Sequence, residues 1–474
     1  MTHTRPNPAQ AGPSAYPPSG ETGADDPDPD RARAPDGPDG RSGPRGGPRA
    51  GERIEGRFGL FSATARPGPT EGAEAAARAA AGGGAAGNAR DAGAAGFRPD
   101  PLAAAFLQLI AHDMCLALSP ETPGAAPAGN RRRGWIDLDS IYGDGRDSRG
   151  RPVGAAALRD PHSPRMMRLA GGRGDAPEGL PWINGPEDPC PLAARPCGFA
   201  LAPAGDMRPP RPLLADPRNG GDPLLEKLVL AALRLHNRAA LALADEGVPE
   251  SDPTIGFLRA REELRLLVQW LALNAALPAL AGDDALEDAT DAGAPLFSRL
   301  AEREAGGIPP LPLELVAALL PLVALHRGPD GAAGADPDRL AALVALGGRA
   351  GLPSGQCVHR MAASALKLRM APMTATEIAD GPGAAALSGP LSEDTPLALY
   401  LLREAEERGD GETLGPLGAA LLAETLVGLV SRDPMSYWRR PGDTGGRWRP
   451  EDGVLRRNGR PIVTLEDFIA AAED

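Results

Sequence analysis

Apolar residues recur at helical spacing along most of the chain beyond residue 97. Proline and glycine clusters separate these stretches, and the two-residue alternation typical of β-strands is scarce. The pattern predicts a mainly α fold, with one large helical domain over residues 97–474 and long irregular loops, of which 143–221 is the longest. The predicted helices span residues 102–118, 223–246, 254–281, 312–326, 336–346, 395–408 and 415–431.

The chain before this domain has a different pattern. Residues 1–52 are rich in Pro, Gly, Asp and Arg and nearly lack large apolar side chains, so we predict a disordered arm. Residues 53–96 hold one short apolar patch, at 58–63, followed by an Ala/Gly tract. We therefore expect 53–96 to be a poorly ordered lead-in to the helical domain.

The composition narrows the class of protein. The 474 residues carry a formal net charge of −13 and a pI of about 5.1, which argues against nucleic acid as a partner. No run of about 18 apolar residues occurs, so no transmembrane segment is expected. The N-terminus lacks the apolar core of an ordinary signal peptide. A cytoplasmic protein is the default expectation, and export without an N-terminal signal stays open.

Cysteine usage does not indicate a disulfide scaffold. The four cysteines are too few for one, and no spacing of Cys and His matches a zinc site. Cys190 and Cys197 are close enough in sequence to form one bridge, and free thiols agree equally well with the sequence.

Three polar residues interrupt the apolar helix expected at 102–118. Gln108 and His112 are four residues apart and so share one helix face, and Asp113 follows directly. Burying an amide, an imidazole and a carboxylate together is costly unless each has a partner or a task. The simpler interpretation is a core histidine that donates to a backbone carbonyl.

Other chemistry-bearing residues follow along the chain. Asp137 and Asp139 alternate in a short loop, a pattern that directs oxygen ligands toward a hard cation such as calcium, although a solvated turn would also produce it. Arg218 lies in a turn just before the long helix at 223–246, and a polar cluster at 234–238 interrupts that helix.

Taken in order, these segments resemble the animal-type haem peroxidases, the superfamily that includes the cyclooxygenases and bacterial peroxidases. FLQLIAHDM resembles the distal-histidine helix of that family, WIDLDSIYG its calcium loop, and ADPRNGGDPLLEKLVLAALRLHNRAA its distal-arginine turn and the following helix. Three C-terminal segments resemble the bacterial members: LPSGQ, TPLALYLLREAE and LGPLGAALLAETLVGLVSRDPMSYW. The resemblance covers roughly residues 97–470.

The resemblance implies a haem site with a complete distal half. His112 matches the residue that takes a proton from hydrogen peroxide and returns it to the leaving oxygen. Arg218 matches the cation that stabilises the developing negative charge, and Gln108 the residue that holds distal water or halide. The implied cofactor is non-covalent haem b, and the implied substrates are hydrogen peroxide and a halide or small organic reductant, with a tie to oxidative stress.

The same resemblance implies a calcium ion beside the distal helix. The matching ligand positions are the side chains of Asp113, Asp137 and Asp139 and the carbonyls of Arg133 and Trp135. Such an ion would join the distal helix to the loop and so fix His112.

The proximal half departs from the family pattern. The axial histidine of the family falls on Val323 or Ala324, and its propionate-binding arginine on Leu320 or Pro321. Residues 340–348 offer no asparagine to orient a proximal histidine. His326 is the only histidine nearby, and it is the candidate axial ligand; the alternative is a helix-end histidine favoured by the helix dipole. Pro321 should also kink this helix.

We expect no role in the haem site for the histidines at 162, 236 and 359. His236 should make structural hydrogen bonds within its polar cluster, and His162 and His359 are expected at the surface. Two main hypotheses follow: a working haem peroxidase, or a degenerate member that keeps the scaffold and serves for binding or scaffolding. A lipid dioxygenase is a remote third, because the chain has only four tyrosines to provide a radical.

Overall fold

The structure is a computed structural model of the chain. All the residues that it describes lie within the unit Arg49–Asp474. The predicted arm at 1–52, Arg133, Cys190 and Cys197 lie outside the described residues. The residues that the structure describes are 66–82, 96–115, 135–143, 156–170, 180–183, 211–245, 253–302, 311–327, 336–366, 368, 370–380 and 384–473.

The fold is mainly α, as the sequence pattern predicts. The described residues include two short antiparallel ribbons: β1 (Trp182–Ile183) pairs with β2 (Arg211–Pro212), and β3 (Arg456–Arg457) with β4 (Arg460–Pro461). The longer α-helices are α1 (Ala73–Gly82), α2 (Pro101–Met114), α4 (Pro223–Asp245), α5 (Pro253–Leu271), α7 (Asp284–Ala292), α8 (Pro295–Glu302), α9 (Leu320–Arg327), α10 (Pro337–Arg349), α11 (Gly355–Leu366), α14 (Leu397–Arg408) and α15 (Pro416–Arg432). Shorter helical elements are α3 (Asp139–Tyr142), η3 (Ala156–Leu158), η5 (Pro217–Asn219), η6 (Ala272–Ala276), α6 (Leu277–Ala281), η7 (Leu315–Leu319), α12 (Ala375–Ile378), η8 (Ala384–Leu387), α13 (Pro390–Glu393) and α16 (Leu465–Ala470).

Aspartate–proline pairs start several of these helices. Asp100 caps α2 by accepting from the N–H of Ala103 at 2.7 Å, and Pro101 occupies the first helical position. Asp336 and Pro337 start α10 in the same way, and Asp222 accepts from two N–H groups at the start of α4. The carboxylate satisfies backbone donors that have no partner within the helix, while proline has no N–H to lose there.

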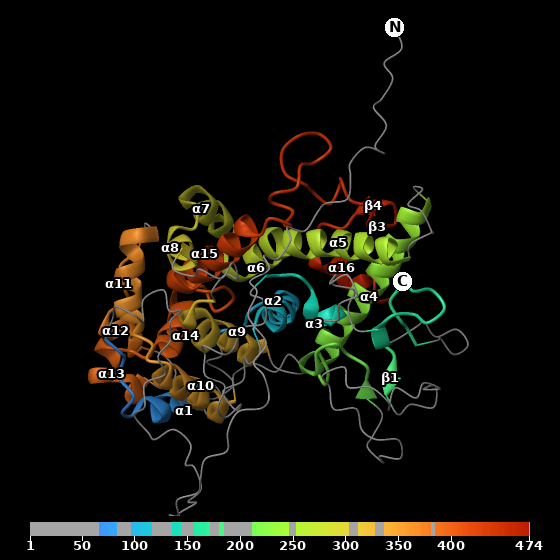
Figure 1. Ribbon diagram of the computed structural model, residues 1–474. Helices are drawn as coiled ribbons and strands as arrows, with labels where there is room; N and C mark the ends of the chain where they lie inside the picture. Colours follow the sequence, from blue (N-terminus) through green and yellow to red (C-terminus); the bar gives the residue numbers. More distant parts are fainter. Residues whose placement is uncertain are drawn as a thin grey trace, which may run out of the picture. The chain divides into compact units, whose positions relative to one another are not determined.

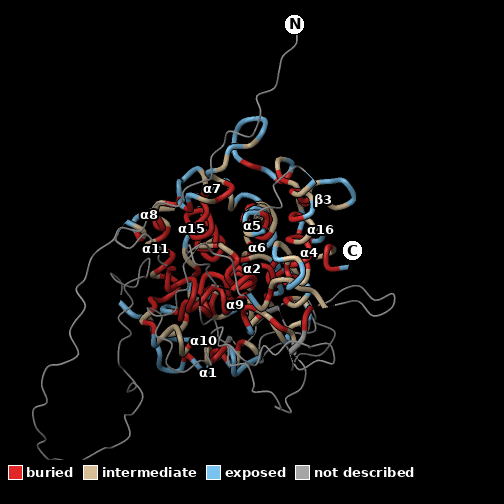
Figure 2. Tube along the Cα trace, turned by 45° about the vertical axis from the view of Figure 1, so that its right-hand side comes forward, coloured by how far each residue is buried: buried red, intermediate tan, exposed pale blue. Residues whose placement is uncertain are grey.

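Helix α2 lies in the middle of the helical unit (Figure 1) and contacts α4, α9, α16 and the η6–α6 segment. Its residues from Ala103 to Met114 are buried except for the half-buried Gln108. Figure 2 shows the buried chain gathered around α2, α9 and α15, with exposed residues at the periphery. The polar residues of α2 are therefore placed in the main hydrophobic core.

Two helices contain a five-residue π-helical segment just before a proline. Segment η6 precedes Pro278, and segment η7 precedes Pro321, each by two residues. Proline within a helix has no N–H and its ring clashes with the carbonyl four residues earlier, and a wider π turn relieves that clash. A π-helical segment thus lies directly before Pro321, where the sequence predicts a kink.

All seven predicted helices are present, with ends shifted by a few residues. The sequence pattern did not predict α7, α8 and α11, nor α1, which lies in the stretch expected to be poorly ordered. Within the described chain, one helix, Pro253–Ala281, is long and apolar enough to cross a membrane by length and composition alone, and most of its apolar stretch is buried inside the protein.

Candidate functional site

His112 lies in the last turn of α2, and the structure pairs it with Asn219 of η5. Nδ1 of His112 is 2.7 Å from Oδ1 of Asn219, and Nδ2 of Asn219 donates to the carbonyl of Ser140 at 3.2 Å. Because a carbonyl only accepts, the second contact fixes the orientation of the amide, and Oδ1 must then accept an N–H from Nδ1. Nε2 of neutral His112 therefore carries the lone pair that a proton acceptor needs.

Arg218 lies against the same turn of α2. Its Nη2 donates to the carbonyl of His112 at 2.8 Å and to Asp216 Oδ2 at 2.6 Å, and its Nε donates to Asp216 Oδ1 at 3.0 Å. The structure thus brings the predicted arginine to the predicted histidine. The guanidinium is bound to the backbone of His112 and to a carboxylate that neutralises its charge.

Gln108 is half-buried, one turn before His112 on the same helix face, as the sequence spacing predicts. His112 itself is 3% exposed. Gln108 is thus the least buried residue of α2 between Ala103 and Met114.

Asp113 connects α2 to the loop before α3. Its Oδ2 accepts the N–H groups of Asp137 and Leu138 at 2.7 and 2.6 Å, and its Oδ1 accepts that of Ser140 at 2.8 Å. Burial, with repulsion from Asp137 and Asp139, raises the pKa of Asp113 to about 8, and the N–H donors of Ser140 and Leu138 oppose the rise. The loop is therefore fixed to α2 through its own backbone.

A cation from the protein itself reaches the two loop aspartates. Nη2 of Arg261 on α5 donates to Oδ1 of Asp139 at 2.9 Å and to the carbonyl of Asp137 at 2.8 Å. Among the described residues, no group of three or more His, Cys, Asp or Glu side chains could hold a metal ion. Trp135 is half-buried, and Arg133 lies outside the described chain. Protein donors thus hold this loop in the structure, and calcium ligation by Asp113, Asp137 and Asp139 stays a prediction.

His236 on α4 makes structural hydrogen bonds, as expected. Its Nε2 donates to the carbonyl of Arg165 at 3.0 Å, so Nδ1 accepts from the hydroxyl of Tyr142 at 2.8 Å. Burial, together with the charges of Arg159 and Arg261, lowers the pKa of His236 to about 3. This imidazole is neutral and fixes α4 to α3.

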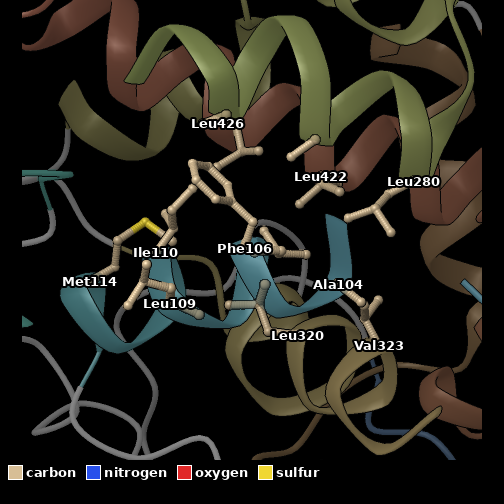
Figure 3. Close-up of a cluster of buried hydrophobic side chains, with 14 of the residues drawn as sticks. Ala104, Phe106, Leu109, Ile110, Met114, Leu280, Leu320, Val323, Leu422 and Leu426 are labelled. Atoms are coloured by element: carbon tan, nitrogen blue, oxygen red, sulfur yellow. The ribbon is translucent and has the colours of Figure 1, made fainter. Parts of the chain in front are cut away.

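The segment expected to carry the axial ligand is packed into the core. Residues 311–323 are all buried, and α9 contacts α2 directly. Figure 3 shows Leu320 and Val323 of α9 in the apolar cluster beneath α2, with Val323 beside Ala104. Ala324 is half-buried. His326 lies in the last turn of α9, and its side chain lies outside the described residues.

The expectation for His359 is wrong: its side chain is fully buried between α11 and α14. His359 follows a glycine by four residues, and that glycine allows the close approach of α14 that encloses it. His162 is exposed, as expected.

The sequence pattern gave no indication of two residues of the distal cluster, Asn219 and Arg261. Asn219 directly follows Arg218, and this position next to a predicted site residue was the one indication of its role in the sequence. Arg261 lies on the apolar face of α5, four residues after Phe257 and three before Leu264, and both are buried. A charged residue at such a position indicates a buried partner.

Comparison with known proteins gives limited information. No protein-family model matches the chain, and no curated protein matches it. Among solved structures, it is similar to peroxidase A from Dictyostelium discoideum, with 15% identity, coverage of 89% of this chain and 92% of that chain, and a TM-score of 0.47.

Proposed function

We propose that this chain is a haem-peroxidase-like protein that has lost the haem-ligating half of its site and serves as a binding or scaffolding protein. The observation that supports this proposal most strongly is the packing of α9. Val323, at an expected ligand position, and Leu320, at an expected propionate-binding position, are buried in the apolar cluster against α2. Neither Val323 nor Ala324, the other expected ligand position, has a side chain that can ligate iron.

The proximal residues do not fit a haem group. Helices in direct contact have their axes about 8–10 Å apart, with side chains filling the space between them. A porphyrin between α2 and α9 would need the space that Leu320 and Val323 occupy. On α10, the segment expected to orient a proximal ligand buries Leu340, Leu343 and Val344 instead. We therefore derive no reaction step through haem.

The distal polar residues have a structural role that explains their retention. Asp113 fixes the 137–140 loop, Asn219 connects His112 to Ser140, and Arg218 fixes the η5 turn to α2. Each buried polar group thereby gains partners that offset its loss of water. A buried polar network of this kind can persist without catalysis.

A working haem peroxidase is the second candidate, and one observation favours it. The Asn219 contact leaves the lone pair of His112 on Nε2, the form that can accept a proton from hydrogen peroxide. In this alternative, Arg218 supplies fixed positive charge, Gln108 holds water or halide, and His326 provides the axial ligand to non-covalent haem b. The reductant would be a halide or a small organic donor.

Peroxide-dependent oxidation of a chromogenic donor separates the two candidates. Protein from haem-supplemented culture would be compared with its His112→Ala and His326→Ala variants. The proposal predicts the same background rate for all three proteins. A rate that falls by two orders of magnitude or more in His112→Ala, and is lost in His326→Ala, would support the peroxidase instead.

A further inference from the structure

We propose that this chain binds a second copy of itself, with the exposed side of α7 in each copy lying on the hairpin 439–449 of the other. Each copy presents both surfaces, so the contact forms twice in a two-fold dimer. The inference does not depend on the proposed function, because neither surface contains a residue of the candidate site. It rests on the opposite charges of the two surfaces.

The hairpin that follows α15 has two different faces. The N–H of Trp448 donates to the carbonyl of Arg440 at 2.8 Å, so these two residues lie opposite each other, and the next pair toward the turn forms an antiparallel bridge. Opposite residues, and residues two apart on one strand, share a face. Arg440 and Trp448 therefore share the inner face. The other face, called here the arginine face, carries Arg439, Arg447 and Arg449.

The inner face fixes the hairpin to α5. Nη1 of Arg440 donates to Oε1 of Glu262 on α5, and Trp448 is buried. Just beyond the hairpin, the N–H of Val454 donates to Oε2 of Glu263 on the same helix at 3.1 Å. The arginine face is therefore the side of the hairpin opposite α5, and its three arginines are exposed.

Two guanidinium groups of the arginine face are held in place by the protein. Cζ of Arg447 lies 3.4 Å from the centre of the Trp438 ring, and Nε of Arg439 donates to the carbonyl of Ser431 at 2.8 Å. Stacking occupies the flat face of one guanidinium, and the other uses one of its five N–H groups, so both keep donors for a carboxylate. Groups already fixed in position lose less conformational freedom on binding.

Helix α7 has the opposite charge on its exposed side. Its apolar side holds Ala285, Leu286 and Ala289, and the helix contacts α15. No basic residue occurs between 283 and 293. The acidic residues recur three and four positions apart, so they share the side away from the core. This acidic face consists of five exposed residues: Asp283, Asp284, Glu287, Asp288 and Asp291.

The acidic face is unfavourable in a single chain. It contains three pairs of acids four residues apart, 283 with 287, 284 with 288 and 287 with 291, and like charges at this spacing destabilise a helix. Asp291 also lies in the last turn of α7, where the helix dipole disfavours negative charge. A cationic partner offsets both effects, because it replaces repulsion between carboxylates with attraction.

The two faces lie at the same end of the helical unit. Helix α7 contacts α15, and Arg439 binds the last turn of α15 through the carbonyl of Ser431. Figures 1 and 2 show α7 and the loop between α15 and β3 at one end of this unit. Because the faces are neighbours, one two-fold axis places the acidic face of each copy on the arginine face of the other.

The charges on the two faces are complementary. The hairpin 439–449 contains four arginines and a single acid, Asp443, whereas the acidic face carries carboxylates alone. Arginine binds a carboxylate through two parallel N–H groups. Single exposed ion pairs contribute little, so the dimer depends on several pairs that form twice.

Sedimentation equilibrium of the full chain at about 0.05 M salt, which keeps screening weak, measures the association. We expect a wild-type dimer and two weakened charge-reversed variants. The α7 variant is Asp284→Lys with Glu287→Lys and Asp291→Lys, and the hairpin variant is Arg439→Glu with Arg447→Glu and Arg449→Glu. Each variant should raise the dissociation constant at least about tenfold, because it brings like charges together. A wild-type chain that stays monomeric up to millimolar concentration would overturn the proposal.

Net charge alone predicts a different result for the α7 variant. Wild type is acidic overall, so this variant is less negative and its copies repel each other less at long range. A dimer governed by net charge would therefore strengthen, whereas the proposal predicts weakening. The matched control reverses three exposed acids beside α1 and α13, and it should bind at least as tightly as wild type: Glu71→Lys, Glu393→Lys and Asp394→Lys.

Mixing the two variants provides the second measurement. In the mixture, the reversed hairpin meets the reversed α7, and the unchanged α7 meets the unchanged hairpin, so both contacts are complementary again. The mixed dimer should form at least about tenfold more tightly than either variant binds itself. A mixture that does not associate, or a control that weakens as much as the α7 variant, would contradict the proposed contact.

Discussion

At the residue scale, the polar side chains His112 and Asp113 of α2 form hydrogen bonds with residues of neighbouring segments. His112 and Asn219 illustrate this, because each satisfies a group that would otherwise be buried without a partner. Asn219 is fully buried, so water cannot replace it easily. The pair should therefore behave as one energetic unit.

Replacing Asn219 with alanine tests that unit. Asn219→Ala removes the acceptor of His112 Nδ1–H and the donor to the Ser140 carbonyl, and should lower the free energy of unfolding by about 1–3 kcal/mol. Urea denaturation of Asn219→Ala, His112→Ala and the double variant gives the coupling between them. We expect a coupling energy of about 0.5–3 kcal/mol. Strictly additive losses would show that the two side chains do not depend on each other.

Asp113 gives a second prediction at this scale. Asp113→Asn replaces an oxygen that accepts N–H groups with an amide donor, so it should lower the free energy of unfolding by about 2–4 kcal/mol. Asp137→Asn is the matched control, because Asp137 is half-buried and its Oδ1 accepts the N–H of Asp139 in its own loop at 3.3 Å, whereas Asp113 is fully buried. Urea denaturation should show a loss of about 1 kcal/mol or less for the control. Equal losses would show that the loop is not fixed through Asp113.

At the element scale, α9 is the helix on which the proposed function depends. Its apolar face contacts α2, and the π-helical segment η7 absorbs the effect of Pro321 just before that contact. The helix thus presents leucine and valine to its neighbour.

A histidine introduced on α9 tests whether the α2–α9 contact leaves any open space. Val323→His buries a larger, polar side chain in a filled core and should lower the free energy of unfolding by at least about 2 kcal/mol. Leu325→His, two residues later at a half-buried position, should cost about 1 kcal/mol or less. Thermal or urea unfolding measures both. A Val323→His protein as stable as wild type would mean that an open space adjoins Val323.

At the scale of the whole molecule, the sequence predicts the helices better than the contacts between them. The apolar spacing predicts long amphipathic helices such as α4 and α15. The sequence pattern did not predict α11, because its buried face contains small and polar residues such as Gly355 and His359. These residues are buried because they contact Tyr400 of α14, which is distant in the sequence. A helix face of this kind has no regular apolar spacing, so the sequence alone predicts it poorly.

The same limit applies to the candidate site. Spacing along one helix predicts that Gln108 and His112 share a face, and motif order places Arg218 near them. The partners Asn219 and Arg261 come from other segments, and the tautomer of His112 follows only from the Asn219–Ser140 contact. Long-range hydrogen bonds of this kind depend on the tertiary fold.

We expect the α2–α9 contact to leave no space for a ligated haem. An absorption titration of the purified 474-residue chain with haemin, followed by the haem-to-protein ratio after gel filtration, measures this. We expect no sharpened Soret band and no haem retained with the protein. A stoichiometric complex with the spectrum of a histidine-ligated haem, lost in His326→Ala, would contradict it.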